Sequence, residues 1–215
     1  MPSRLLKIFL GATLAFAPAL GREPANLDVL KGEIRAYLDS GEYDRETAAV
    51  AAQAGEWLEQ RVKRGGAHLA IVFDLDETLF SNLPLIRGQD FAYNAVTWNA
   101  WVADGKAPAI PAVRDLYLRA RALKVEIIFI TGRHERHRAG TEKNLRAIGC
   151  GDYTRLILKP DGSSETTGAF KLAARRRLES EGHVIIANIG DQDSDLEGGV
   201  AERGFKLPDP FYLTK

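Results

Sequence analysis

Residues Leu69–Phe80 read LAIVFDLDETLF, and this stretch decides how the chain folds. Its first five residues are apolar, which is the length and pattern of a strand buried on both faces of a parallel sheet. Gly65-Gly66 breaks the chain just before it. Asp74 and Asp76 therefore stand where the strand leaves the sheet, at the edge where open α/β sheets bind ligands.

Asp74, Asp76 and Thr78 form a D-x-D-x-T pattern directly after this strand. Two neighbouring carboxylates repel each other, and burying them requires a cation or a shared proton. The alternative is that both residues merely end a strand. The cost of burying two charges favours a functional pair that binds a metal ion or shares a proton.

Strands and helices alternate along the rest of the chain. Further apolar runs of strand length occupy residues 125–130, 156–158 and 184–189, and residues 204–207 are a candidate fifth strand. Helical patterns occupy residues 113–123, 135–148 and 166–181. This alternation predicts an α/β fold with a doubly wound parallel sheet.

Two helices are predicted upstream of the sheet. Asn26 caps the first, whose apolar residues recur at helical spacing as far as Leu38, and Gly41 ends it. The second is rich in alanine and begins at Asp44. We assign residues 22–66 to an N-terminal helical accessory element.

Residues 1–21 have the pattern of an export signal. Arg4 and Lys7 supply the positive start, residues 8–20 carry no charge, and small residues offer a cleavage site. The apolar run is too short to span a membrane comfortably. We therefore expect a periplasmic or secreted protein with a signal peptide, and an uncleaved interfacial anchor is the alternative.

Charge and cysteine content limit the partners. The chain has 29 basic and 29 acidic residues, or 27 and 29 once the leader is removed, so no general attraction to nucleic acid or anionic membranes is implied. We expect no nucleic-acid polymer as a partner and no stable membrane insertion after processing; homo-oligomerisation stays open. Cys150 is the single cysteine and cannot form an internal disulfide.

The motifs in order resemble those of the haloacid dehalogenase (HAD) superfamily. They are D-x-D-x-T after the first strand, Thr131 after the second, a lysine in the helix 166–181, and the G-D-x-x-x-D pattern at 190–195. Within the superfamily the chain resembles the acid phosphatases related to plant vegetative storage proteins and their bacterial secreted homologues. The segments that carry this closer resemblance are 129–133, 190–196 and 205–212.

The resemblance covers residues 24–213 and implies a Rossmannoid phosphatase core over residues 67–215. A small cap insertion is expected at about residues 81–111, where several aromatic residues gather. These rings either stack on a substrate or form the insertion's own small core.

The resemblance also implies roles for single residues. Asp74 is expected to attack phosphorus and form an aspartyl-phosphate, and Asp76 to act as general acid and then general base. Thr131 is expected to hydrogen-bond the phosphoryl group. Lys171 is expected to neutralise the phosphate and the nucleophile, with Lys159 as the competing lysine because it too follows a strand.

A Mg²⁺ ion is the implied cofactor, bound by the Asp74 carboxylate, the Asp76 backbone carbonyl and Asp191. Asp195 is expected to orient a metal-bound water, and Arg175 to lie either behind the site or at the surface. Dehalogenation uses the same nucleophile, but Lys171 together with Asp191 and Asp195 suits a metal and a phosphate better.

Three functions follow. The first is a secreted, Mg²⁺-dependent acid phosphatase that hydrolyses small-molecule phosphate monoesters. The second is a non-catalytic storage or binding protein on the same fold, which would have no need of Asp74. The third is a phosphotransferase to alcohol or nucleoside acceptors, which would use the same intermediate.

Overall fold

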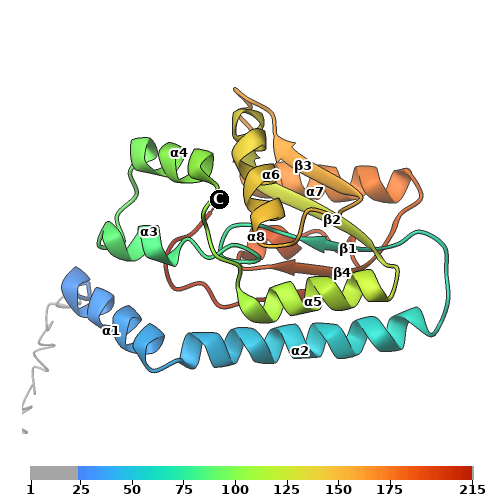
Figure 1. The fold of residues 1–215 in the computed structure, drawn as a ribbon, viewed down its shortest axis with the longest axis horizontal. Helices are drawn as coiled ribbons and strands as arrows, with labels where there is room; N and C mark the ends of the chain where they lie inside the picture. Colours follow the sequence, from blue (N-terminus) through green and yellow to red (C-terminus); the bar gives the residue numbers. More distant parts are fainter. Residues whose placement is uncertain (1–23, 215) are drawn as a thin grey trace, which may run out of the picture.

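The structure, a computed structural model, describes residues 24–214, so the proposed signal peptide lies outside the described residues. A five-stranded sheet of order β3-β2-β1-β4-β5 forms its centre (Figure 1). Every neighbouring pair of strands is parallel, which confirms the predicted α/β fold. The strands are β1 (Leu69–Phe73), β2 (Glu126–His134), β3 (Arg155–Lys159), β4 (Val184–Gly190) and β5 (Gly204–Lys206).

The long helices are α1 (Leu27–Asp39), α2 (Glu42–Val62), α5 (Pro111–Ala122), α6 (Arg138–Ala147) and α7 (Thr167–Ser180). Shorter ones are α3 (Leu83–Gly88), α4 (Ala95–Asp104), the 3-10 turn η1 (Glu135–His137) and α8 (Asp193–Leu196). The predicted helix over residues 135–148 is thus divided into η1 and α6. β2 also runs four residues past the predicted end, because its last residue, His134, pairs with Lys159 of β3 after a register shift.

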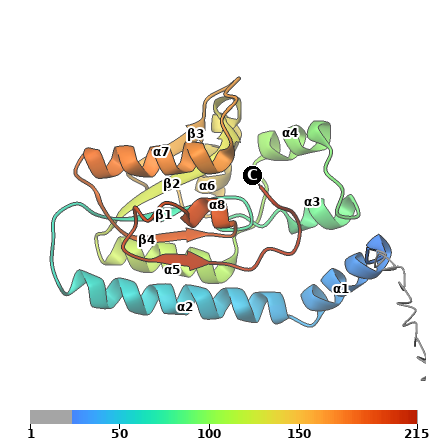
Figure 2. The ribbon, with the colours of Figure 1, turned by 180° about the vertical axis from the view of Figure 1, so that it is seen from behind.

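Helices cover both faces of the sheet, as Figures 1 and 2 show. Along β1, Ile71 and Phe73 belong to the core that includes residues of α2 and α5, whereas Ala70 and Val72 pack with residues of α7. All four are at most 2% exposed. The uninterrupted apolar run is therefore a strand buried on both sides, as its sequence predicts.

The two N-terminal helices form as expected. Asn26 Oδ1 accepts a hydrogen bond from the Asp28 backbone N–H at 2.9 Å, and Gly41 adopts a left-handed φ of 72° between α1 and α2. α2 runs beneath the sheet beside α5 (Figure 1), and its Ala54 and Leu58 are fully buried in the main core. The boundaries of the accessory element stay a prediction.

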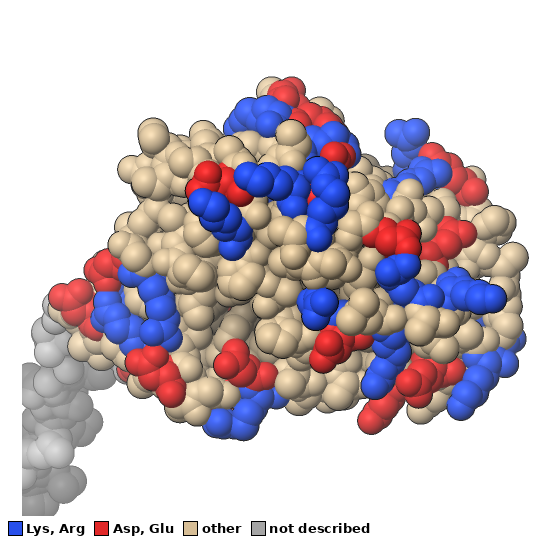
Figure 3. All heavy atoms as spheres, in the orientation of Figure 1, with Lys and Arg blue, Asp and Glu red and all other residues tan. Residues whose placement is uncertain are grey.

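Two segments meet over the carboxyl edge of the sheet. The first follows β1 and carries α3 and α4, of which α4 packs against α6. The second is the C-terminal segment after β5, which passes between the core and this insertion (Figure 2). None of the helices in residues 24–214 combines the length and apolar composition needed to cross a membrane. Both signs of charge are interspersed over the face in Figure 3.

Candidate active site

Three buried aspartates converge at the carboxyl edge of the sheet. Asp74 follows β1, Asp191 follows the neighbouring β4, and Asp195 lies in α8. One carboxylate oxygen from each lies within 4.8 Å of the other two. Gly190 permits this approach, because a Cβ at that position would collide with the side chain of Asp195. The fold therefore gathers aspartates from three elements at one point.

Lys171 of α7 neutralises part of this cluster. Its Nζ lies 2.5 Å from Asp74 Oδ1 and 2.5 Å from Asp195 Oδ1, and its side chain is 5% exposed. Burial disfavours the ammonium, but the two carboxylates outweigh burial and raise the pKa of Lys171. Burial raises the pKa of Asp74 to about 7, although Lys171 opposes this shift. Lys171 is therefore the fixed cation beside Asp74.

Lys159, the competing lysine, lies elsewhere. Its Nζ donates to the backbone carbonyl of Glu165 in the loop before α7. The structure thus brings Lys171 rather than Lys159 to Asp74.

Asp76 is held by Arg133. Arg133 Nη2 lies 2.6 Å from Asp76 Oδ1, and Nε lies 2.9 Å from Oδ2, a two-pronged ion pair. The Arg133 guanidinium lies over the rings of Phe80 and Trp98, 5.0 and 5.6 Å from their centroids. Burial acts to raise the pKa of Asp76, but Arg133 outweighs it and holds the pKa below its ordinary value. Asp76 is therefore a carboxylate when no substrate is bound.

Thr131 and Arg175 are buried near the site without touching the aspartates. The Thr131 hydroxyl accepts from the Arg133 backbone N–H at 3.1 Å, and its role as a phosphate ligand stays a prediction. Arg175 is 1% exposed, and its Nη2 donates to the Glu197 carbonyl at 2.5 Å. This contact supports the end of α8, the helix that carries Asp195.

The aspartates fit a hard divalent cation. They offer oxygen ligands, which Mg²⁺ prefers, and all three are at most 6% exposed. Burial and the charges of Asp74 and Asp195 raise the pKa of Asp191 well above its ordinary value, so an added cation would relieve their repulsion. The Asp76 side chain is engaged by Arg133, and the use of its backbone carbonyl as a metal ligand stays a prediction.

A cavity of about 560 Å³ opens over these groups. Asp74, Asp76, Lys171 and Asp191 line its floor. Its walls include residues of the insertion and of the C-terminal segment, among them Phe91, Tyr93, Trp98, Phe211 and Tyr212. The cavity therefore joins a charged floor to aromatic walls, a form that suits a small ligand with both a charged and an apolar group.

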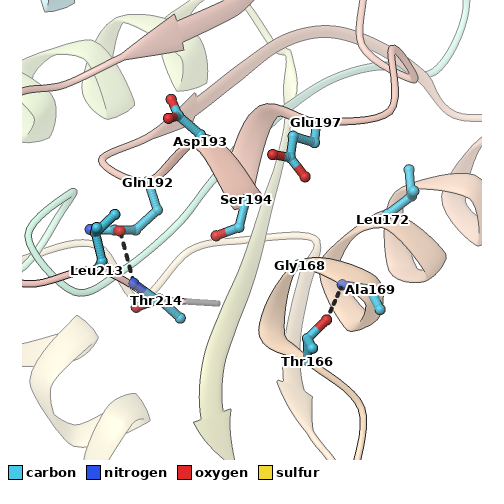
Figure 4. Close-up of a pocket in the computed structure, with 10 residues that line it drawn as sticks. All are labelled: Thr166, Gly168, Ala169, Leu172, Gln192, Asp193, Ser194, Glu197, Leu213 and Thr214. Atoms are coloured by element: carbon cyan, nitrogen blue, oxygen red, sulfur yellow. Dashed lines mark hydrogen bonds between the residues drawn. The ribbon is translucent and has the colours of Figure 1, made fainter. Parts of the chain in front are cut away.

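A second cavity, of about 420 Å³, lies beside the first (Figure 4). Its lining comes from three segments: Ser194 belongs to α8, Thr166 caps the start of α7, and Leu213 and Thr214 belong to the C-terminal segment. Gln192 lines both cavities and accepts the Thr214 backbone N–H on its Oε1 at 3.1 Å. The lining of this second cavity includes neither Lys171 nor Asp74, so we place the chemistry in the first cavity.

Sequence reasoning assigned no role to four residues that hydrogen bonds connect to Asp76, either directly or through one another: Arg133, Asn82, Glu77 and Tyr212. Arg133 carried a signal, because it ends the Thr-Gly-Arg run at a strand terminus. Glu77 follows Asp76 directly, but the sequence does not distinguish a buried glutamate at this position from one in an exposed loop. Nothing local marks Asn82, and Tyr212 stands out only as the end of the segment 205–212, which carries part of the family resemblance.

Comparison with known proteins shows the family to which the chain belongs. The family model described as HAD superfamily, subfamily IIIB (acid phosphatase), matches residues 23–215. Acid phosphatase 1 of Solanum lycopersicum is 35% identical over 184 residues, which are 83% of this chain and 72% of that protein. Vegetative storage protein 1 of Arabidopsis thaliana is 31% identical over 208 residues, 91% of this chain and 77% of that protein.

The fold has a counterpart among solved structures. The class C acid phosphatase from Bacillus anthracis superposes with a TM-score of 0.72, covering 87% of each chain at 22% sequence identity. At that identity the likeness concerns the fold. With nearly the whole described chain inside the family match, this protein belongs to subfamily IIIB of the HAD superfamily, the acid phosphatases, and is a phosphomonoesterase.

Proposed function

We propose that the protein is an exported, Mg²⁺-dependent acid phosphatase that hydrolyses small phosphate monoesters through an aspartyl-phosphate on Asp74. The observation that carries this proposal is the contact of Asp74 with the buried Lys171 ammonium on the floor of the aromatic-walled cavity. A carboxylate nucleophile facing an anionic phosphate needs such a fixed positive charge.

The reaction has two steps. In the first, an Asp74 oxygen bonds to phosphorus while the bond from phosphorus to the leaving oxygen breaks, and Asp76 protonates that oxygen. In the second, Asp76 takes a proton from water as the water attacks phosphorus, which releases phosphate and restores Asp74. Lys171 stabilises the negative charge on the phosphoryl oxygens throughout.

Asp76 has to gain a proton before it can donate one. Arg133 favours the carboxylate in the free protein. A bound phosphate brings negative charge close to Asp76, which raises its pKa and opposes the effect of Arg133. An acidic medium adds to this for Asp76, whereas Asp74, whose pKa burial raises to about 7, would need Lys171 and the cation to stay ionised as the nucleophile.

The cation would be held by Asp74, Asp191 and the Asp76 backbone carbonyl. When bound, it screens the anionic phosphate from the aspartates and orients it. We also propose that Thr131 hydrogen-bonds the phosphoryl group, and that Asp195 and Arg175 hold Lys171 and α8 in place.

A storage role without catalysis is the alternative, since one relative is a storage protein by name. Asp74 and Lys171 argue against it here, because a storage protein does not need a buried nucleophile beside a buried ammonium. Phosphoryl transfer to an alcohol would use the same first step and differ in the acceptor, so transfer assays with added alcohols separate the two.

The test compares two aspartate variants by rapid mixing. Asp74→Asn should abolish turnover of every ester, because no covalent bond can form. Asp76→Asn should release nitrophenol from nitrophenyl phosphate in a burst approaching one equivalent and then turn over slowly, since nitrophenolate leaves without a proton. With an alkyl phosphate the same variant should be nearly inactive and show no burst. Near-normal alkyl phosphate turnover by Asp76→Asn would overturn the role of Asp76.

A further inference from the structure

The C-terminal segment is fastened across the carboxyl edge of the sheet. The Leu207 backbone N–H donates to the Gly190 carbonyl at 2.9 Å, immediately before Asp191. Further along, the ring of Phe211 lies 5.7 Å from Tyr43 of α2 and 6.5 Å from Phe91 of the insertion, measured between centroids. The segment therefore contacts the core, an N-terminal helix and the insertion at once.

Tyr212, the next residue, turns its hydroxyl inward. The hydroxyl donates to Glu77 Oε2 at 2.8 Å, across 135 residues of sequence. Glu77 is 1% exposed and has a φ of 54°, a left-handed conformation that residues with a side chain rarely adopt. Its side-chain contacts offset that strain.

Asn82 continues the connection to Asp76. Its Nδ2 donates to Glu77 Oε2 at 3.0 Å and to Asp76 Oδ1 at 2.9 Å. Trp101 Nε1 donates to Asn82 Oδ1 at 2.7 Å, which fixes the orientation of the amide. Asn82 is fully buried, so water does not compete for these bonds.

We propose that Tyr212 is a positioning residue for the phosphatase reaction. Its hydroxyl holds Glu77, and through Asn82 it keeps the Asp76 carboxylate aligned for proton transfer. This inference rests on the role proposed for Asp76. Without the hydroxyl, Glu77 still accepts two hydrogen bonds, both from Asn82. The series of hydrogen bonds that ends at Asp76 would then no longer be connected to the C-terminal segment.

The experiment removes the Tyr212 hydroxyl and keeps its aromatic ring. Tyr212→Phe should lower kcat for an alkyl phosphate about tenfold, as expected when a hydrogen bond to a buried carboxylate is lost, with KM little changed. The burst rate with nitrophenyl phosphate should stay near that of the unchanged protein, because that step does not depend on Asp76 as acid. A structural defect alone would not distinguish the two leaving groups.

The matched control is Tyr37→Phe. Tyr37 on α1 also donates its hydroxyl to a glutamate, Glu46, at an exposed site away from the cavity. This variant should leave both rates unchanged. Unchanged alkyl phosphate turnover in Tyr212→Phe, or equal losses with both leaving groups, would overturn the proposal. If Tyr212→Phe does not fold, as judged by circular dichroism, Glu77→Gln tests the same connection and should show the same dependence on leaving group.

A double variant separates this inference from the proposed function. If Tyr212 acts through Asp76, adding Tyr212→Phe to Asp76→Asn should not lower the slow steady rate with nitrophenyl phosphate any further, because that step has already lost Asp76 as its base. If Asp76→Asn alone still turns over alkyl phosphates normally, the role of Asp76 is what fails. If Asp76→Asn behaves as proposed and Tyr212→Phe lowers the steady rate further in that background, Tyr212 acts by another route.

Discussion

Lys171 sets the charge balance of the site because its buried ammonium lies between Asp74 and Asp195. Removing it would leave two buried carboxylates without their partner, and a substrate dianion would add to the repulsion. Arg133 carries charge to the same region but is already paired with Asp76. Lys171 and Arg133 therefore have separate partners, and neither can replace the other.

Lys171→Gln should lower kcat/KM for every phosphate ester about a thousandfold, since a fixed donor to the phosphoryl oxygens is lost. Lys159→Gln is the matched control, because Lys159 is also largely buried but binds the Glu165 carbonyl away from Asp74. Steady-state kinetics on purified variants measures both. A Lys159 variant as inactive as the Lys171 variant would contradict the assignment.

At the scale of elements, Trp98 and Trp101 of α4 make different contacts. Trp98 lines the cavity and stacks on Arg133, whereas Trp101 bonds to Asn82. The sequence left open whether the aromatic residues of the insertion bind substrate or form its own small core. Residues three apart lie on the same face of a helix, yet in the structure Trp98 lines the cavity while Trp101 donates a hydrogen bond to Asn82.

Trp98→Ala should raise KM for aryl phosphates by about three- to tenfold, the loss expected for one aromatic contact, and leave KM for small alkyl phosphates nearly unchanged. Trp98→Phe keeps a ring beside Arg133 and should show a smaller effect. Initial-rate measurements with the two substrate types give the comparison. Equal effects on both would mean that Trp98 only packs the insertion.

At the scale of the whole molecule, the aspartate cluster depends on β1, β4 and α8 being packed together. A cation bound there would favour the folded state by about 2.7 kcal/mol at a free concentration one hundred times its Kd. Metal binding and global stability are therefore linked in this protein.

Chelation should remove activity and Mg²⁺ should restore it. Mg²⁺ should also raise the melting temperature, and Asp191→Asn should lose most of that rise while requiring much more Mg²⁺ for activity. Asp193→Asn is the control, because Asp193 is exposed two residues away. Calorimetry with and without Mg²⁺ measures the shift. Full activity in chelator would show that the aspartates serve another purpose.

The last prediction concerns export of the whole chain. If residues 1–21 are a signal peptide, mass spectrometry of the native protein should find a mature N-terminus near Leu20 or Arg22. Cytosolic protein that retains Met1 would contradict export.

Local patterns in the sequence determined the main elements of this protein. The apolar run before Asp74 specified a buried central strand, and the alternation of strands with helices specified a parallel sheet. Because parallel strands end at one edge, the residues after β1 and β4 had to meet there. The convergence of Asp74 and Asp191 was therefore predictable from sequence spacing.

Contacts between distant segments were decided by the tertiary structure. Both Lys159 and Lys171 had sequence arguments, and the packing of α7 on the sheet brought Lys171 to Asp74. Arg133 meets Asp76 across 57 residues, and Tyr212 meets Glu77 across 135. The Tyr212–Glu77 pair depends on the path of the C-terminal segment over the edge of the sheet, which no local pattern encodes, whereas Arg133 and Asp76 stand at the ends of the neighbouring strands β2 and β1.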